Sequence, residues 1–222
     1  MLEALLRIIA PHTCLVCHAE GSLLCQWCKH DAIDVVPDRC YRCFSITQDA
    51  QTCQKCRKTS TLSHVWVRSI YADTSRELLY GLKFQRTKAA ARQIAELLDE
   101  AIPVLPHETI VTYVPTATSR VRLRGYDQSR LIAREFAKIR SLECTTLLLR
   151  HGQARQVRSD RTQRFKQAAN AYSIKSLGKV NQKRILLVDD IMTTGATLEA
   201  VSKLLKKSGA AQIDGAIFAQ KQ

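Results

Sequence analysis

The most informative segment of this chain is Ile185-Leu-Leu-Val-Asp189-Asp190-Ile-Met-Thr193-Thr194-Gly195-Ala196-Thr197. Its first four residues are apolar and bulky, which is typical of a strand at the buried centre of a parallel sheet. Two carboxylates follow, and then a turn of small and hydroxyl-bearing residues that opens a helix. Because ligands of open α/β sheets bind beyond the carboxyl ends of central strands, the segment predicts both a fold class and the place of a binding site.

The residue types in this segment suit a sugar that carries a phosphate. Backbone N–H groups and threonine hydroxyls of the turn can bind the phosphate at the positive end of the helix dipole. Asp189 and Asp190 can accept hydrogen bonds from two adjacent sugar hydroxyls. A simple helix cap after a core strand is the alternative. It is disfavoured because two adjacent carboxylates at a buried strand end are costly without a partner.

Periodic patterns on both sides extend the segment into an α/β domain. Strands are predicted at 64–71, 109–114, 184–188 and 212–219, and helices at 74–84, 88–102, 128–140 and 197–207. Alternating strands and helices predict a mostly parallel sheet flanked by helices. We therefore expect two domains, an α/β domain at 61–222 and a small module at 1–60.

The small module is defined by its cysteines. Eight of the nine cysteines form four Cys-x-x-Cys pairs, namely Cys14/Cys17, Cys25/Cys28, Cys40/Cys43 and Cys53/Cys56. A two-residue spacer aims two thiolates at one ion, so the eight ligands predict two closed, structural zinc sites in a zinc-ribbon module. The ligands can pair sequentially or in a cross-braced arrangement. Removal of zinc is expected to destabilise residues 14–56 and to leave the α/β domain largely folded.

Two other uses of the cysteines are disfavoured. A disulfide framework is expected in secreted chains, and Glu3 stands where a signal peptide would carry positive charge. An iron–sulfur cluster fits the paired spacing less well than zinc does. No stretch approaches the ~20 apolar residues that span a bilayer. We expect a cytoplasmic protein, with a peripheral position at the inner face of the membrane as the alternative.

The charge of the chain is concentrated in its middle. The net charge is +14, and residues 115–184 hold 17 Lys and Arg against 4 Asp and Glu, a net charge of +13. This concentration favours an anionic partner, with a solvated basic face as the alternative. With 45% hydrophobic and 24% charged residues, the composition is that of a globular protein and favours neither a disordered chain nor a membrane protein.

A second loop with phosphate-binding chemistry follows the strand predicted at 109–114. It contains Thr116, Ala117, Thr118, Ser119 and Arg120, whose hydroxyls, small side chains and cation suit a diphosphate. The 185–197 segment resembles the signature for phosphoribosyl pyrophosphate (PRPP) of the type I phosphoribosyltransferases, and the second loop is similar to the pyrophosphate loop of their amidotransferase-like members.

This resemblance implies a type I phosphoribosyltransferase-like fold and a set of ligand contacts. Asp189 and Asp190 would hold the ribose hydroxyls of PRPP. The 5′-phosphate would be wrapped by Thr193, Thr194, Gly195, Ala196 and Thr197. Mg²⁺ would be held mainly by substrate oxygens and water. Residues 150–172 would form the family's flexible loop.

Over essentially its whole length the chain resembles the ComF/GntX family, which is associated with DNA uptake in naturally competent bacteria. Besides the cysteine pairs and the PRPP signature, the resemblance rests on Leu82-Lys83-Phe84, on Arg124-Gly125-Tyr126-Asp127-Gln128, and on Arg164 with Ala171-Tyr172. Arg86, Asp127 and Gln167 depart from the family's usual Gly, Asn and Asn at these elements.

The family resemblance implies a competence protein that handles incoming single-stranded DNA in natural transformation and binds PRPP. Its partners would include a helicase or channel component of the uptake machinery. Candidate DNA contacts are Arg122, Arg124, Arg155, Arg158, Arg161, Arg164 and Lys166. Candidates for base stacking are Tyr126, Phe136, Phe165 and Tyr172, of which Phe136 fits a core position better.

An active phosphoribosyltransferase is the second hypothesis. Such an enzyme would transfer ribose 5-phosphate from PRPP to a nucleobase or another acceptor. Arg120 and the arginines of the flexible loop would stabilise the leaving pyrophosphate. No catalytic base and no acceptor pocket can be assigned from the sequence.

Overall fold

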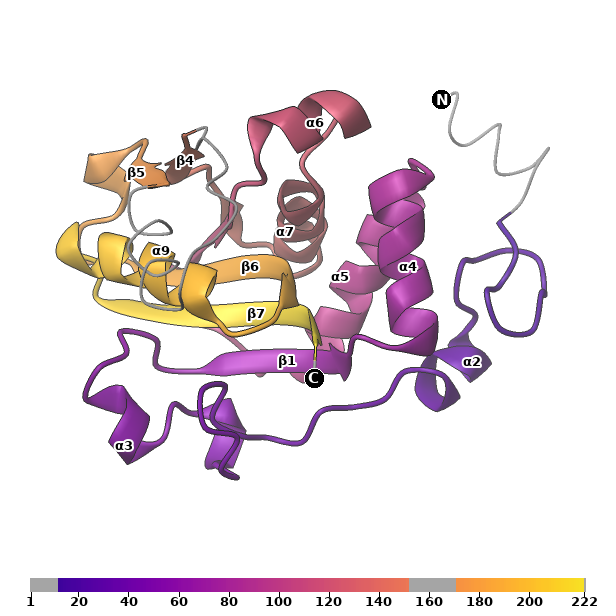
Figure 1. Ribbon diagram of the computed structural model, residues 1–222, viewed down its shortest axis with the longest axis horizontal. Coiled ribbons are helices and arrows are strands. Elements are labelled where there is room, and N and C mark those ends of the chain that lie inside the picture. Colours follow the sequence, from indigo (N-terminus) through magenta and orange to yellow (C-terminus); the bar gives the residue numbers. More distant parts are fainter. Residues whose placement is uncertain (1–11, 152–170, 222) are drawn as a thin grey trace, which may run out of the picture.

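The computed structural model describes residues 12–151 and 171–221, and Figure 1 shows a sheet with helices on both faces and the N-terminal segment along one edge. The sheet contains β1 (Val65–Ile70), β2 (Ile110–Tyr113), β3 (Glu143–Cys144), β6 (Arg184–Met192) and β7 (Gln212–Gln220). Their order is β1-β7-β6-β2-β3, and every neighbouring pair is parallel. The apolar strands β6 and β7 are therefore internal, as expected for strands covered on both faces.

Helices cover both faces of the sheet. One face carries α4 (Asp73–Phe84), α5 (Ala89–Ala101) and α7 (Gln128–Ile139), and the other carries α9 (Ala196–Lys207). Successive residues of β6 supply the two apolar layers in turn. Leu186 and Val188 belong to the first layer, and Ile185 and Leu187 to the second. This alternation is the period-two geometry of a strand, and it confirms the predicted fold class.

Shorter elements connect this framework. They are α2 (Gln26–Asp31), η1 (Gln48–Ala50), α3 (Gln54–Arg57), α6 (Thr118–Arg124), η2 (Leu177–Lys179) and the antiparallel pair of β4 (Leu148–Arg150) and β5 (Tyr172–Ile174). None of the helices in residues 12–151 and 171–221 is long and apolar enough to cross a membrane.

Two elements near the binding segments differ from the sequence prediction. Strand β6 continues to Met192, so Asp189 and Asp190 lie within the strand and not beyond it. The reason is that β7 continues beside it, with Met192 paired to Gln220. The second loop is also shorter than predicted, because the helix-favouring run Arg120-Val-Arg-Leu-Arg124 forms α6 from Thr118 onward.

The N-terminal module, residues 12–60, lies along the edge of β1 (Figure 1). Val35 and Gln51 form isolated antiparallel bridges to Ser69 and His64. Trp66 of β1 donates its indole N–H to Asp49 at 3.1 Å. The module thus covers an edge that would otherwise offer unpaired backbone groups to other chains. The division at residue 60 stays a prediction, and contacts cross it.

Candidate functional site

Asp189 and Asp190 lie near the carboxyl end of β6, beside the start of the second loop. Tyr113 of β2 pairs with Val188, and the N–H of Val114 donates to the carbonyl of Val188 at 3.0 Å. This register brings residues 115–120 to the same end of the sheet as the two carboxylates. The second loop and the 185–197 segment, which were predicted separately from the sequence, are therefore neighbours in the structure.

The two carboxylates have different environments. Asp190 is 6% exposed, and its Oδ2 is 2.6 Å from Nζ of Lys83 on α4. Asp189 is partly exposed, and its Oδ1 accepts hydrogen bonds from Ser129 Oγ at 3.1 Å and from the N–H of Asp190 at 2.9 Å. Burial and the neighbouring Asp190 carboxylate raise the pKa of Asp189 well above its ordinary value. Donors such as sugar hydroxyls would favour its charged form.

The segments 82–84 and 124–128, on which the family resemblance partly rests, pack against each other near this end of the sheet. The hydroxyl of Tyr126 donates to the carbonyl of Leu82. The guanidinium of Arg124 lies 5.3 Å from the centre of the Phe84 ring and donates to Gln128 at 2.8 Å. Arg124 is only 9% exposed. Its position corrects the expectation of a DNA contact, because its guanidinium is committed to packing inside the protein.

Asp127 ties the second loop to α7. Its carboxylate accepts from the N–H and hydroxyl of Thr116, at 2.7 and 3.2 Å, and caps α7 through the N–H of Arg130 at 3.2 Å. Burial raises the pKa of Asp127, and these hydrogen bonds oppose that rise. The remaining residues nominated for pyrophosphate are Ala117, before α6, and three exposed residues of its first turn, Thr118, Ser119 and Arg120.

The turn nominated for the 5′-phosphate opens α9. Thr193 and Thr194 are exposed, and Ala196 and Thr197 are partly exposed. Gly195 is the N-cap residue, with φ of 71°, which is the left-handed region that favours glycine. A Cβ atom at this position would also lie 3.2 Å from the ring of Tyr41 in the N-terminal module.

The eight paired cysteines form two sulfur clusters. The sulfurs of Cys14, Cys17, Cys25 and Cys28 lie within 4.8 Å of one another, as do those of Cys40, Cys43, Cys53 and Cys56. The pairing is therefore sequential and not cross-braced. The Cys17–Cys25 and Cys43–Cys53 sulfur distances are 3.8 and 3.5 Å. A tetrahedral site with zinc–sulfur bonds of about 2.3 Å has sulfur–sulfur edges of about 3.8 Å, so both clusters fit zinc.

Hydrogen bonds to sulfur support this assignment. The N–H groups of Cys25 and Cys28 lie 3.5 Å from the sulfurs of Cys14 and Cys25. Burial raises the pKa of Cys14, but backbone N–H groups outweigh it and lower that pKa to about 6. Thiolates are the form that binds zinc. Within the described residues these are the only groups of three or more His, Cys, Asp or Glu placed to share an ion.

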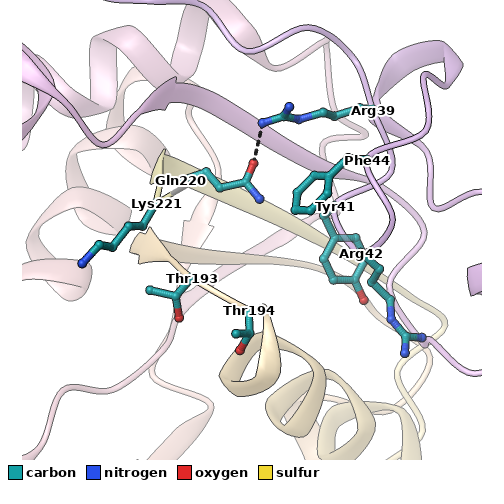
Figure 2. Close-up of a pocket in the computed structure, with 8 residues that line it drawn as sticks. All are labelled: Arg39, Tyr41, Arg42, Phe44, Thr193, Thr194, Gln220 and Lys221. Atoms are coloured by element: carbon teal, nitrogen blue, oxygen red, sulfur yellow. Dashed lines mark hydrogen bonds between the residues drawn. The ribbon is translucent and has the colours of Figure 1, made fainter. Parts of the chain in front are cut away.

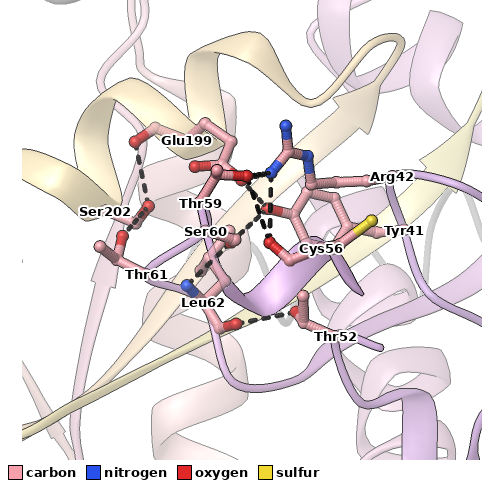
Figure 3. A network of polar contacts seen from close by, with 10 residues as sticks. All are labelled: Tyr41, Arg42, Thr52, Cys56, Thr59, Ser60, Thr61, Leu62, Glu199 and Ser202. Atoms are coloured by element: carbon pink, nitrogen blue, oxygen red, sulfur yellow. Dashed lines mark hydrogen bonds and ion pairs between the residues drawn. The ribbon is translucent and has the colours of Figure 1, made fainter. Parts of the chain in front are cut away.

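The second cluster is joined to α9 through a buried carboxylate (Figure 3). Tyr41 and Arg42, between the ligands Cys40 and Cys43, both reach Glu199. The Tyr41 hydroxyl donates to Glu199 Oε1, and Arg42 Nη1 is 3.6 Å from the same oxygen. Burial and Glu199 raise the pKa of Tyr41, so its hydroxyl stays a donor. Glu199 is 2% exposed, and its N–H donates to the carbonyl of Gly195 at 2.9 Å.

The other DNA candidates are distributed unevenly. Arg122 is exposed on α6. Five lie outside the described residues, namely Arg155, Arg158, Arg161, Arg164 and Lys166. Of the stacking candidates, Phe136 and Tyr172 are buried, as the sequence suggested for Phe136, and Phe165 lies outside the described residues.

Several site residues were missed by sequence reasoning. Lys83 belongs to the Leu82-Lys83-Phe84 motif of the family resemblance, but nothing in the sequence indicated its ion pair with Asp190. Tyr41, Arg42 and Glu199 gave no signal, because Tyr41 and Glu199 are 158 residues apart and meet only in the folded chain.

Comparisons with known proteins agree with this architecture. Residues 129–222 match the family model described as phosphoribosyl transferase domain. Competence protein F of Haemophilus influenzae is 31% identical over 218 residues, which cover 88% of this chain and 92% of that protein. Competence protein ComFC of Streptococcus pneumoniae is 24% identical over 214 residues, with 95% and 94% covered. DNA utilization protein YhgH of Escherichia coli is 26% identical over 205 residues, with 78% and 86% covered.

A weaker likeness is found among solved structures. The glutamine PRPP amidotransferase of B. subtilis is 16% identical and has a TM-score of 0.42, with 59% of this chain and 26% of that chain covered.

Proposed function

The chain belongs to the family of competence protein F, and from this premise we propose that it handles incoming single-stranded DNA in natural transformation and binds PRPP at the end of its parallel sheet. The observation that carries the proposal is the meeting of Asp189, Asp190 and the 193–197 turn at the carboxyl end of β6, in a chain whose relatives are named for competence and DNA utilization.

The PRPP half of the proposal is supported by complementary chemistry. Asp189 carries a carboxylate that lacks a cationic partner of its own among the described residues, so ribose hydroxyls would stabilise it. Thr193 and Thr194 are exposed at the start of α9, where backbone N–H groups can bind a phosphate. Arg120 is exposed on α6 and would contact the diphosphate.

The DNA half is supported by charge. Residues 115–184 carry a net charge of +13, and exposed Arg120 and Arg122 lie on α6 at the carboxyl end of the sheet. A row of cations follows a phosphodiester backbone without reading its sequence. We further propose that the protein acts in the cytoplasm with proteins of the uptake machinery.

The metal ions have separate proposed roles. Two zinc ions, one in each cysteine cluster, would hold the N-terminal module and take no part in chemistry, because four thiolates leave no open position. Mg²⁺ would arrive with PRPP and neutralise its diphosphate. This chain would contribute the orientation of the ribose through Asp189 and Asp190.

An active phosphoribosyltransferase is the second candidate function, favoured by the family match of residues 129–222. Incubation with PRPP, Mg²⁺ and a panel of nucleobases, with and without single-stranded DNA, separates the two candidates. Pyrophosphate release that depends on one base identifies an enzyme. Binding of PRPP and DNA without release supports the competence role alone.

The DNA role is tested by measuring oligonucleotide affinity against salt concentration. We expect Arg120→Gln with Arg122→Gln to weaken binding several-fold and to reduce the slope of log affinity against log salt by about 1 to 2. The double variant Arg57→Gln with Lys58→Gln, which removes two exposed charges near α3, is the matched control and should bind as the unchanged protein does. Affinity that does not depend on salt would contradict a phosphate-backbone mode.

A further inference from the structure

Four of the Phe, Trp and Tyr side chains in residues 12–151 and 171–221 are exposed, and two of them form a pair on α4. Of the other two, Trp27 lies on α2, and Phe44 lines a cavity of about 600 Å³ beside the turn that opens α9 (Figure 2). Phe44 therefore belongs to the site already described. Tyr80 and Phe84 are 53% and 62% exposed, and their ring centres are 5.1 Å apart.

The aromatic pair lies on the face of α4 that does not pack against the core. Leu78, Leu79 and Leu82 of this helix are buried. Tyr80 and Phe84 are one helical turn apart on the opposite side, where a helix of a globular protein carries polar residues. Contiguous apolar surface that is exposed in this way marks an interaction site.

The ring of Phe84 is held in place from the protein side. The guanidinium of Arg124 lies 5.3 Å from the centre of the ring and donates to the buried Gln128 at 2.8 Å. Arg124 is 9% exposed, so its cation supports the ring from within, while most of the ring faces solvent. A flat apolar surface that is already ordered loses little conformational entropy when a ligand binds to it.

Cations gather at the end of α4 that carries Phe84. The segments 78–93 and 115–126 hold seven Lys and Arg and no Asp or Glu. Lys88 is exposed, and its Nζ lies 5.8 Å from the centre of the Tyr126 ring. Burial raises the pKa of Tyr126, and the charges of Arg124 and Arg86 oppose that rise, which places Arg86 beside the same ring. The positive groups therefore converge next to the aromatic pair.

One of these cations has a backbone conformation that favours glycine. Arg86 is exposed and has φ of 57°, a region that long side chains rarely adopt. The chain thus carries a charge at a turn where glycine would be less strained. Asp73 and Glu77, the acidic residues of α4, both come before the aromatic pair, so the end of the helix is left with positive charge alone.

We propose that Tyr80, Phe84, Arg86 and Lys88 form a surface, the α4 surface, that binds single-stranded DNA with bases stacked on the two rings and phosphates beside the two cations. A base between the rings would need roughly 7 Å, twice the contact distance of about 3.5 Å, so at 5.1 Å the bases stack on the outer faces.

The combination of rings and cations selects this ligand over a protein. Sites for single strands join aromatic rings to a cationic track, whereas the core of a protein–protein interface is depleted of charged residues. The inference rests on the DNA half of the proposed function, and it assigns the bases of the strand to named residues outside the proposed PRPP site.

The first experiment measures the affinity of the full zinc-loaded chain for oligo(dT) and for an abasic strand of equal length, by fluorescence anisotropy at several salt concentrations. Both strands carry the same phosphates, so the ratio of the two affinities isolates the bases. We expect a ratio of about ten in the unchanged protein. Tyr80→Leu with Phe84→Leu should bring the ratio close to one and leave the salt dependence unchanged. Tyr80→Phe with Phe84→Tyr keeps both rings and should keep the ratio.

The charge of the α4 surface is tested separately. Arg86→Gly removes a cation and relieves the backbone, so the variant should fold. We expect it to weaken binding of both strands equally, by several-fold, and to reduce the slope of log affinity against log salt by about 1, with the ratio unchanged. Trp27→Leu removes an exposed ring from α2 and is the matched control, which should change neither the ratio nor the slope.

A strand that contains 5-bromodeoxyuridine locates the bases directly. After irradiation, we expect cross-links in peptides that contain Tyr80 or Phe84, identified by mass spectrometry. Cross-links found only at Trp27 or Phe44 would overturn the inference. This measurement uses the unchanged protein, so it decides the question even if the double leucine variant does not fold.

The outcomes separate this inference from the proposed function. If the unchanged protein binds both strands equally, or if the double leucine variant keeps the ratio, the α4 surface is refuted while salt-dependent binding still supports the DNA role. If neither strand binds, the inference and the DNA half of the proposed function both fail. A double leucine variant that keeps the ratio and changes the oligomeric state in sedimentation would identify the aromatic pair as a contact between copies of this chain.

Discussion

At the scale of the residue, the two adjacent carboxylates of β6 are not equivalent. Lys83 compensates Asp190 at 2.6 Å, whereas Asp189 is held by Ser129 and by the N–H of Asp190. The pKa of Asp189 is therefore raised by burial and by its charged neighbour. A carboxylate left in this state stores unfavourable energy in the free protein, and a bound ligand with hydroxyl donors can release it.

This difference predicts the effect of Asp189→Asn. A carboxyl whose pKa is higher in the folded chain binds its proton more tightly when folded, so the free energy of unfolding falls as pH rises above about 4. Asn carries no charge and can still accept from Ser129. We expect the variant to be about 1 kcal/mol more stable at pH 7.5, with a flatter pH dependence, and to lose PRPP binding. Thermal melts at pH 5 and pH 8 and calorimetry measure both.

Glu143→Gln is the control for that experiment, because it changes the net charge equally. Hydrogen bonds from Thr145 and Lys179 lower the pKa of Glu143, so its charged form is favoured in the fold. The substitution should leave stability unchanged or lower it. An Asp189→Asn chain that is less stable than the unchanged protein would contradict the assignment.

At the scale of the element, the turn between Cys40 and Cys43 fixes the start of α9. The Tyr41 hydroxyl is bound to Glu199, and the Tyr41 ring lies against Gly195 of the 193–197 turn. The N-terminal module thus contributes to the shape of the proposed phosphate site. Thr61 adds a second link to α9, through the hydroxyl of Ser202 at 2.8 Å.

Tyr41→Phe tests this link. It removes the donor to a buried carboxylate, and we expect a loss of about 1–3 kcal/mol in the free energy of unfolding and a several-fold loss in PRPP affinity. Tyr80→Phe, which removes an exposed hydroxyl from α4, is the matched control and should change neither quantity. Urea denaturation and calorimetry report the two effects. If Tyr41→Phe binds PRPP as tightly as the unchanged protein does, the N-terminal module does not shape the proposed phosphate site.

Elements and ligands that are local in sequence were predictable, and those assembled from distant segments were not. The 185–197 segment and the cysteine pairs each hold their chemistry within a few residues, so their composition alone indicated what they bind. Lys83 and Glu199 acquire their roles from partners on other elements. An acceptor pocket could not be predicted for the same reason, because its walls would come from segments far apart in the sequence.

At the scale of the whole molecule, the N-terminal module and the α/β domain share one apolar core. Cys14, Leu24 and Ile33 belong to the same buried cluster as Ile94 and Leu98 of α5. Lys29 of α2 adds an ion pair with Glu100 of α5. Because the two parts share this core, loss of zinc should also lower the stability of the α/β domain.

We expect Cys17→Ser and Cys43→Ser each to lower Tm by about 10 °C, through a single transition that includes the sheet. Far-UV circular dichroism and the fluorescence of Trp66, in a chain with Trp27→Phe, should report the same midpoint. Only Cys43→Ser should also weaken PRPP binding, because Tyr41 and Arg42, between the ligands of its cluster, hold Glu199 of α9. Two separate transitions, with the α/β domain unchanged, would instead support the independent module that the sequence suggested.

The strand order has a consequence for synthesis on the ribosome. Within the described sheet, β1 pairs only with β7, whose partner residues are made about 150 residues later, whereas each cysteine cluster is complete within about 20 residues. Zinc can therefore bind while most of the chain is still to be translated. The nascent N-terminal module must wait for β7 before the sheet closes and the end that carries Asp189 and Asp190 takes shape.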